Sequence, residues 1–355
     1  MSDMTADGIV DKTGLVKSLV SHCNAYKGGH TGRSIIQLSL SFSLFMVTCA
    51  AMLLCLQNDL VWPVVLLWLP AGGFLVRLFI IQHDCGHMSF FTTRKANDWT
   101  GRILSLFTVT PYAFWRDAHN MHHAASGNLD GRGVGSIDTL TVTEYQNLTP
   151  FRRLCYRMYR NPFVVLVLGP PLHVILIQRI PFKGMAPFFE GYKSIPYKKA
   201  WRSILGLNLG LVAFYGVLSY AIGFSTVLMI FLAPIMIAAW AGGWLFFIQH
   251  QFEDTYWEER KNWNFQEAAV LGSSYYKLHP ILQWFTGNIG LHHIHHLCSM
   301  IPNYKLQECL DGNSDLQKMN VMTLGESLRC VPLALWDDAK KAMITFRQLH
   351  TKKEA

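Results

Sequence analysis

Charged residues are scarce in this chain of 355 residues. Asp, Glu, Lys and Arg together make up 15% of it, against about 25% in a typical soluble domain. Hydrophobic residues make up 51%, and the mean hydropathy is +0.20. The charges that are present are mainly basic, with 31 Lys and Arg against 23 Asp and Glu. This composition argues against an ordinary soluble domain and predicts a protein that lies largely in a membrane.

Paired cysteines are also missing. The eight cysteines contain no CxxC pair, and Cys49 and Cys55 lie inside apolar stretches. This usage fits a reducing cytoplasm better than a disulfide framework. The first residues, MSDMTADGIVDKTG, are polar and acidic, which is not the pattern of a secretory signal. The first apolar stretch is therefore expected to direct insertion into the membrane.

Four apolar stretches reach the length of about 20 residues that crosses a hydrocarbon core. They are residues 35–56, 60–82, 204–223 and 226–249. Buried helices of large soluble proteins are usually shorter and more amphipathic. Two shorter apolar stretches, residues 101–115 and 162–178, contain prolines. We expect these two to lie in the membrane interface or to pack in the soluble part.

The distribution of basic residues predicts the orientation. With four spans, the outer connections are residues 57–59 and 224–225, and neither contains a Lys or Arg. All 31 basic residues then fall on one side, with Arg77 near the inner end of its span. This is an extreme form of the positive-inside rule. Both termini, including residues 1–34, and a cap of residues 83–203 and 250–355 are expected to face the cytoplasm.

Nine of the fifteen histidines stand in three motifs: HDCGH (83–87), HNMHH (119–123) and HHIHH (292–296). Residues i, i+3 and i+4 of a helix share one face, so each motif can present imidazoles together. Imidazoles gathered in this way point to a metal site. All-imidazole ligation suits Fe, Zn, Cu or Ni, which leaves the metal open. Eight or nine imidazoles exceed the needs of one ion and fit two ions with four or five ligands each.

The motifs also predict where the metal would lie. His83 follows the second apolar stretch and His250 follows the fourth, so the site would sit at the membrane surface, within reach of an acyl chain. A dinuclear zinc hydrolase would carry bridging carboxylates, and no HExxH motif occurs. Two adjacent irons, in contrast, could bind and cleave O2. The expected fold is a single domain, residues 1–355: an all-α integral membrane protein with four transmembrane helices in two hairpins. A cytoplasmic helical cap carries the three histidine boxes.

At these motifs the chain strongly resembles the integral-membrane fatty acid desaturases. The matching stretches are HDCGHMSFF (83–91), TPYAFWRDAHNMHHAASGNLDGRG (110–133), IDTLTVTEY (137–145), RNPF (160–163), IQHQFEDTYW (248–257) and GSSYYKLHPILQWFTGNIGLHHIHHLCSMIPNY (272–304). The resemblance covers residues 35–310 and looks closest to the bacterial and cyanobacterial acyl-lipid branch, of the Δ12 (ω-6) or Δ5 kind. It implies a non-haem di-iron centre, O2 as oxidant and a fatty acyl chain of a membrane lipid as substrate.

The resemblance also implies partners and a location. Electrons would come from a separate carrier such as ferredoxin, flavodoxin or a cytochrome, and no HPGG sequence of a fused cytochrome b5 module occurs. The net charge of +8 would attract anionic lipid headgroups, and docking of an acidic carrier is compatible with it. No nucleic-acid partner is expected, and the oligomeric state stays open. The expected location is a bacterial inner membrane.

The resemblance assigns the metal ligands residue by residue. They are His83, His87, His119, His122, His123, His292, His295 and His296 of the boxes, with His250 as the additional histidine that follows the last span. His293 breaks the HxxHH spacing and is expected to support a ligand or to pack. Ligating imidazoles usually donate their second N–H to a carboxylate or carbonyl. The candidate acceptors are Asp84, Asp130, Asp138, Glu144, Glu253 and Asp254, with Asp84 favoured because it lies inside a box.

Three residues are candidates for the substrate tunnel. Trp115 flanks the second box, and Gly242 and Gly243 lie about two turns before His250. The alternative for the glycine pair is close packing of helices.

Two other functions remain open at this level. A hydroxylase, epoxygenase or ketolase would share the metal site and the first hydrogen abstraction. A metal transporter or sensor would need ionisable groups at mid-membrane, which the four apolar stretches lack. Neither the position of a double bond nor the acyl carrier can be derived from the sequence.

Overall fold

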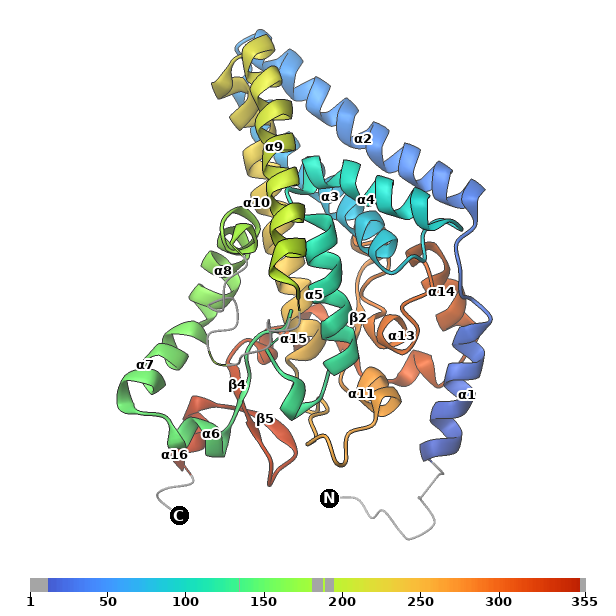
Figure 1. The fold of residues 1–355 in the computed structure, drawn as a ribbon, viewed down its shortest axis with the longest axis vertical. Coiled ribbons are helices and arrows are strands. Elements are labelled where there is room, and N and C mark those ends of the chain that lie inside the picture. The colour runs from blue at the N-terminus through green and yellow to red at the C-terminus, as the bar shows by residue number, and fades with distance from the viewer. Residues whose placement is uncertain (1–11, 134, 181–187, 189–194, 352–355) are drawn as a thin grey trace.

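The computed structural model of the chain describes residues 12–133, 135–180, 188 and 195–351. The expected cytoplasmic position of residues 1–11, and of Lys183 and Lys193 in the cap, falls outside the described residues. The described part consists of a group of long helices above a cap of shorter elements (Figure 1).

Four helices of 26 or 27 residues are long and apolar enough to cross a membrane. They are α2 (Thr31–Gln57), α3 (Val61–Gly86), α9 (Tyr197–Ile222) and α10 (Phe224–His250). Residues 58–60 connect α2 to α3, and α9 meets α10 at Gly223, whose φ of 87° favours glycine. The predicted fold, four spanning helices in two hairpins, is confirmed.

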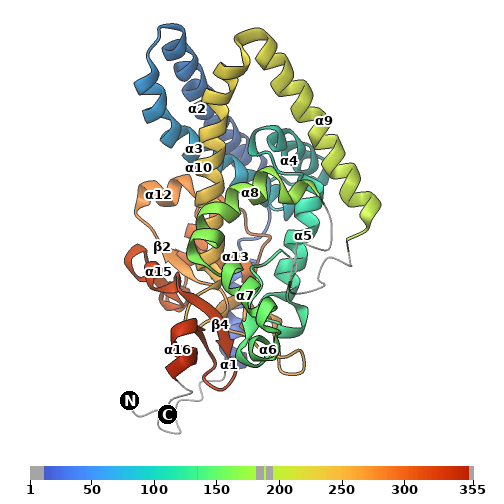
Figure 2. The same ribbon diagram turned by 90° about the vertical axis from the view of Figure 1, so that its left-hand side faces the viewer.

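Helix α3 is the centre of the membrane part. It packs against α2 and α10, and it is the most buried of the four long helices. A core of large side chains joins these helices and includes Phe45, Leu75 and Ile230. Helix α9 packs against α10 but is the least buried of the four, and Figure 2 shows it diverging from α2 and α3. The end of α3 that carries His83 therefore belongs to the most buried of the four helices.

The two shorter apolar stretches do not form straight spans. Residues 101–115 fall on the end of α4 (Arg94–Thr108) and the start of α5 (Tyr112–Ala125), which are separated by left-handed Val109 and by Pro111. Residues 162–178 form the π-helix η3 (Phe163–Leu168), α8 (Gly169–Ile175) and most of η4 (Ile177–Arg179). Phe163–Arg179 meets α7 (Pro150–Tyr159) at 53°, so a fifth candidate span arises only if this bent pair is counted as one.

The cap contains two small sheets that the sequence did not predict. Strand β1 (Leu140–Thr141) pairs in parallel with β4 (Leu333–Asp337), which pairs antiparallel with β5 (Ala342–Thr345). Strand β2 (Tyr275–Lys277) pairs in parallel with β3 (Val321–Thr323). The remaining elements are α1 (Lys12–Asn24), η2 (Leu129–Gly131), α6 (Val142–Asn147), α11 (Phe265–Leu271), α12 (Pro280–Phe285), α13 (His292–Leu297), α14 (Asn303–Asp311), η7 (Leu316–Lys318), α15 (Leu324–Cys330) and α16 (Phe346–Thr351).

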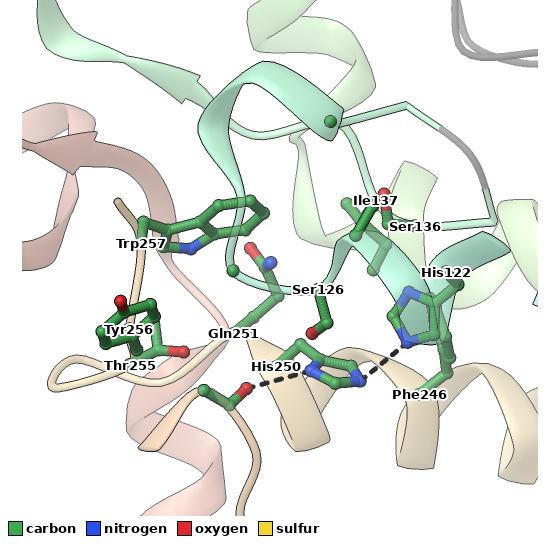
Figure 3. A pocket seen from close by; sticks show the side chains of 14 residues that line it. His122, Ser126, Ser136, Ile137, Phe246, His250, Gln251, Thr255, Tyr256 and Trp257 are labelled. Atoms are coloured by element: carbon green, nitrogen blue, oxygen red, sulfur yellow. Dashed lines mark hydrogen bonds between the residues drawn. The ribbon is translucent and has the colours of Figure 1, made fainter. Parts of the chain in front are cut away.

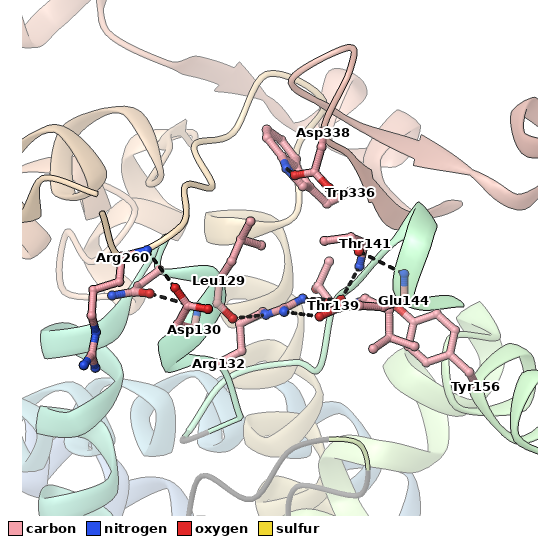
Figure 4. A network of polar contacts seen from close by, with 12 residues as sticks. Leu129, Asp130, Arg132, Thr139, Thr141, Glu144, Tyr156, Arg260, Trp336 and Asp338 are labelled. Carbon is pink, nitrogen blue, oxygen red and sulfur yellow. Dashed lines mark hydrogen bonds and ion pairs between the residues drawn. The ribbon is translucent and has the colours of Figure 1, made fainter. Parts of the chain in front are cut away.

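A polar network fixes the chain that follows α5. Arg132 donates to both carboxylate oxygens of Glu144, at 2.5 and 2.8 Å, and to the carbonyl of Thr139 (Figure 4). Glu144 also accepts from the backbone N–H of Thr141 in a capping box that begins α6. These bonds attach the segment after the second histidine box to α6 and β1.

The topology generates a prediction. The two short connections, residues 58–60 and 223, contain no basic residue, so we expect them outside and the cap inside. An epitope inserted after Asn58 should bind antibody on intact cells, whereas one at the C-terminus should bind only after permeabilisation. If both epitopes are accessible from the same side, the four-span topology is wrong.

Candidate metal centre

Four helices that are distant in sequence bring the histidines together where the long helices enter the cap. His83 lies in the last turn of α3, and His87 follows it. His250 is the last residue of α10. The second box forms the end of α5, and the third box forms nearly all of α13 (Figure 1).

The nine histidines predicted as ligands form two groups. Within each group, one nitrogen per residue lies within 4.8 Å of every other. Group one is His83, His87, His119, His123 and His295. Group two is His122, His250, His292 and His296. The second and third boxes are thus divided between the groups, because neighbouring positions of one helix point to different sides.

The spacing of the nitrogens fits metal binding. In group two, Nε2 of His250 lies 3.1 Å from Nε2 of His122 and 3.0 Å from Nε2 of His292. In group one, Nε2 of His123 lies 3.1 Å from Nε2 of His119 and 3.0 Å from Nε2 of His295. Two imidazole nitrogens about 2.1 Å from one ion at a right angle are about 3.0 Å apart. Both groups therefore have the dimensions of a metal shell.

The imidazoles are also in the right protonation state. Burial lowers the pKa of the seven box histidines outside the membrane helices well below the usual value, and neighbouring imidazoles add to the effect. A neutral imidazole keeps the lone pair that binds a metal. Nε2 of His87 and Nε2 of His296 are buried without a hydrogen-bond partner among the described residues. Such unpaired atoms are costly unless an ion or a ligand meets them.

Two outer contacts orient one ligand of each group. His83 donates from Nδ1 to Asp84 Oδ1 at 3.1 Å, and Asp84 Oδ2 accepts from the backbone and the side-chain amide of Asn303 at 2.6 and 2.8 Å. His250 donates from Nδ1 to the carbonyl of Gly272 at 3.0 Å (Figure 3). In both rings Nδ1 carries the proton, so Nε2 is the unprotonated nitrogen that can bind a metal ion within the group.

The other carboxylates proposed from the sequence point elsewhere. Asp130 accepts from the backbone N–H of Arg260 at 2.8 Å (Figure 4). Glu253 and Asp254 are exposed. Asp130 and Glu253 therefore make no hydrogen bond to a box imidazole in the part of the chain that the structure describes.

Asp138 and Glu144 also have structural partners. Asp138 is buried and accepts from the backbone N–H of Phe188, and burial raises its pKa to about 6. Glu144 pairs with Arg132. Among the six acidic candidates, only Asp84 contacts a predicted ligand within the described ranges.

His293 lies outside both groups. It donates from Nε2 to the carbonyl of Leu316 at 3.0 Å, and its ring stacks on Tyr275 with centroids 5.8 Å apart. It is fully buried and links α13 to η7. This placement fits the packing role that its position in the motif suggested.

Two aromatic side chains line the groups. Trp115 stacks on His119 of group one, with ring centroids 4.7 Å apart and planes at 15°. The ring centroid of Phe246 lies 5.2 Å from that of His122 and 5.8 Å from that of His250, both in group two. Phe246 was not proposed from the sequence, although its position four residues before His250 is a signal that could have found it.

A pocket adjoins group two. His122, His250 and Phe246 line it together with Ser126 and Trp257 (Figure 3). The indole N–H of Trp257 is buried and has no hydrogen-bond partner. Group two is therefore the side of the metal centre with free space beside it.

The two candidate tunnel glycines differ. A Cβ on Gly243 would overlap the ring of Pro170 in α8, so this glycine allows α8 and α10 to approach closely. This contact favours the packing alternative for Gly243. A Cβ on Gly242 would meet nothing within 4 Å. Gly242 remains a candidate for the tunnel.

Fold and site together define a membrane protein in which two histidine groups suited to metal ions lie where the long helices meet the cap. The family model described as "Fatty acid desaturase" matches residues 60–325. The chain is 37% identical to a fatty acid desaturase from Bacillus subtilis (strain 168), over 94% of this chain and 91% of the relative. It therefore belongs to the fatty acid desaturase family, whose members are oxidoreductases.

More distant relatives carry more specific names. The chain is 27% identical to an sn-1 acyl-lipid omega-3 desaturase (ferredoxin) from Nostoc sp. (strain 36), over 72% of this chain and 68% of the relative. It is also 27% identical to an sn-1 oleoyl-lipid 12-desaturase from Arthrospira platensis, over 69% and 66%.

The contact between His83 and Asp84 generates a prediction. Asp84→Asn replaces the charged acceptor, so the metal content of group one should fall, with an affinity lower by about 10- to 100-fold. Metal bound to the purified protein should be measured by elemental analysis, with thermal unfolding as a check of the fold. Asp254→Asn, at an exposed position, is the control. Equal metal content in the two variants would refute the role of Asp84.

The glycine pair gives a matched comparison. Gly243→Leu should destabilise the protein by about 1–3 kcal/mol, because the side chain overlaps Pro170. Gly242→Leu should leave the melting temperature unchanged and, if it borders the tunnel, shift the chain length or double-bond position of the product. Thermal unfolding and product analysis measure both effects. A stable Gly243→Leu variant would contradict the packing role.

Proposed function

We propose that the protein introduces a cis double bond into an acyl chain of a membrane lipid, with O2 as the oxidant and a non-haem di-iron centre. The observation that carries the proposal is the division of nine buried or half-buried imidazoles into groups of five and four. Each group has enough donors for one ion, and within the described residues all of these donors are imidazoles. The names of the acyl-lipid relatives support the substrate class.

The residues present fit two iron ions. Imidazole is a suitable donor for iron, and the nitrogens of each group have the spacing of a common shell. His83, His87, His119, His123 and His295 would hold one ion, and His122, His250, His292 and His296 the other. When bound, such a centre supplies O2 activation strong enough to remove hydrogen from an unactivated C–H bond.

The chain itself supplies position and exclusion of water. The histidines of both groups are buried or half-buried, and Trp115 and Phe246 cover their rings. Because His83 and His250 end membrane helices, an acyl chain can approach from the bilayer without crossing the cap. The pocket beside group two is small, about 20 Å³, which is enough for one water-sized molecule next to the imidazoles.

We further propose that electrons come from an external acidic carrier of the ferredoxin type. Two relatives are named as ferredoxin-dependent. The net charge of +8 would favour the approach of an acidic protein. The cap then has to face the cytoplasm of a bacterial inner membrane, which agrees with the absence of basic residues from the outer connections.

The test is expression in a bacterial host that makes only saturated and monounsaturated chains. The wild type should add a double bond, located by mass spectrometry of the lipids. His87→Ala, His122→Ala and His295→Ala should reduce the product to background and lower the bound iron, because each removes a predicted ligand.

His22→Ala is the control, since His22 bonds to the carbonyl of Cys309 away from both groups. It should keep full activity. Turnover at the wild-type rate in a ligand variant would refute the assignment of that histidine. A hydroxylated product without a double bond would refute desaturation.

A further inference from the structure

A groove of about 740 Å³ lies between α2, α12 and α14, apart from the pocket beside group two. We call it the α2–α12 groove, and the residues that matter here are Arg33, Gln37, Arg77, Lys277, Trp284 and Asn303. Helix α12 packs against α3 and lies beside the lower part of the long helices (Figure 2). The groove is therefore at the level where a membrane helix meets the cap.

The charged residues that line the groove are all basic. Three cations line it, and none of its lining residues is an Asp or Glu. Arg33 is paired with Glu308 at 2.8 Å. Arg77 and Lys277 have no carboxylate partner within the described residues. Arg77 is 7% exposed, bonds to Ser41 and the carbonyl of Trp284, and stacks on the Trp284 ring at 4.0 Å. The groove thus holds a buried guanidinium and an exposed ammonium for one anion.

The rim of the groove is apolar. Ile36 and Leu40 line it from α2 and are 69% and 47% exposed. Ile281 and Leu282 do not line the groove, but they follow its lining residue Pro280 in α12 and are 62% and 46% exposed. Apolar side chains exposed next to a membrane helix, with cations above them, match the boundary between acyl chains and headgroups.

The side-chain oxygen of Gln37 lacks a hydrogen-bond donor. Asn303 donates its side-chain amide to Asp84, so its Oδ1 must face Gln37. Gln37 therefore donates from Nε2 to that oxygen at 2.6 Å and cannot be flipped. Its Oε1 is left buried without a partner, although Gln37 lines the groove and is only 8% exposed. A ligand that offers an N–H or O–H would complete this amide.

We propose that the α2–α12 groove binds the headgroup of a glycerophospholipid. The phosphate lies between Arg77 and Lys277, an ammonium or hydroxyl of the headgroup donates to Gln37, and an acyl chain follows Ile36 and Leu40 into the bilayer. The bound headgroup is linked to the metal centre through Gln37, Asn303, Asp84 and His83 in sequence. Binding of the headgroup does not depend on the reaction proposed for the histidines.

The experiment uses the full chain in detergent and native mass spectrometry. Phosphatidylethanolamine and phosphatidylcholine with identical acyl chains are the probes, since they have equal net charge but only the first carries N–H donors. The wild type should prefer phosphatidylethanolamine, and Gln37→Met should remove the preference. Lys277→Glu should weaken binding of both lipids by about tenfold or more. Lys340→Glu, an exposed lysine in the turn between β4 and β5, should bind as the wild type does.

Two outcomes would overturn the proposal. One is equal binding of the two lipids by the wild type, and the other is equal binding by the Lys277→Glu and Lys340→Glu variants. Inorganic phosphate is the third probe, and displacement of lipid by phosphate at similar concentration would mean a free-anion site instead.

Turnover distinguishes the source of the lipid. A higher KM for acyl-lipid with unchanged kcat in Lys277→Glu identifies the substrate lipid. An unchanged KM with lost binding identifies a second, non-substrate lipid. Both results support the headgroup site, and thermal unfolding of each variant excludes misfolding as the cause.

Discussion

The structure depends on one costly arrangement, in which nine imidazoles converge on two small volumes with their lone pairs turned inward. Burial lowers the pKa of the seven box histidines that lie outside the membrane helices, and Nε2 of His87 and of His296 has no partner among the described residues. Uncompensated polar atoms of this kind oppose folding. Metal ions would turn the same convergence into a source of stability, because each lone pair would gain a strong acceptor. The histidine-bearing parts of α3, α5, α10 and α13 therefore have to lie close together, and the other elements of the cap surround them.

The surroundings of the groups explain much of the cap. Arg160 is 3% exposed and donates at 2.7 Å both to Gln251, the residue after His250, and to the carbonyl of Leu333 in β4. The end of α10 is thus tied to the small sheet. Asn303, at the start of α14, holds Asp84 and through it His83. The sheet and α14 therefore keep two ligands at their positions, although neither carries a box histidine.

Features that depend on local pattern could be predicted from the sequence. The four spans follow from length and hydropathy, and the ligand set from helical spacing and resemblance. The division of His122 and His123 between different groups could not be predicted, because it depends on how α5 faces α10 and α13. The same holds for Asn303 and Gly272, which reach the histidines only through tertiary contacts. The strands of two to five residues are too short to leave a periodic signal.

The two histidine groups differ in the hydrogen-bond partners of their ligands and in the residues that surround them. His83 of group one donates to a carboxylate, whereas His250 of group two donates to a neutral backbone carbonyl. A carboxylate partner makes an imidazole the stronger ligand. Trp115 stacks on group one, while group two borders the pocket with Phe246 and the unpaired indole of Trp257. Group one is thus the more firmly anchored, and group two is the one that borders a small pocket. Each group nevertheless receives one histidine from the end of a long membrane helix, His83 from α3 and His250 from α10, so both groups lie at the level where the membrane part meets the cap.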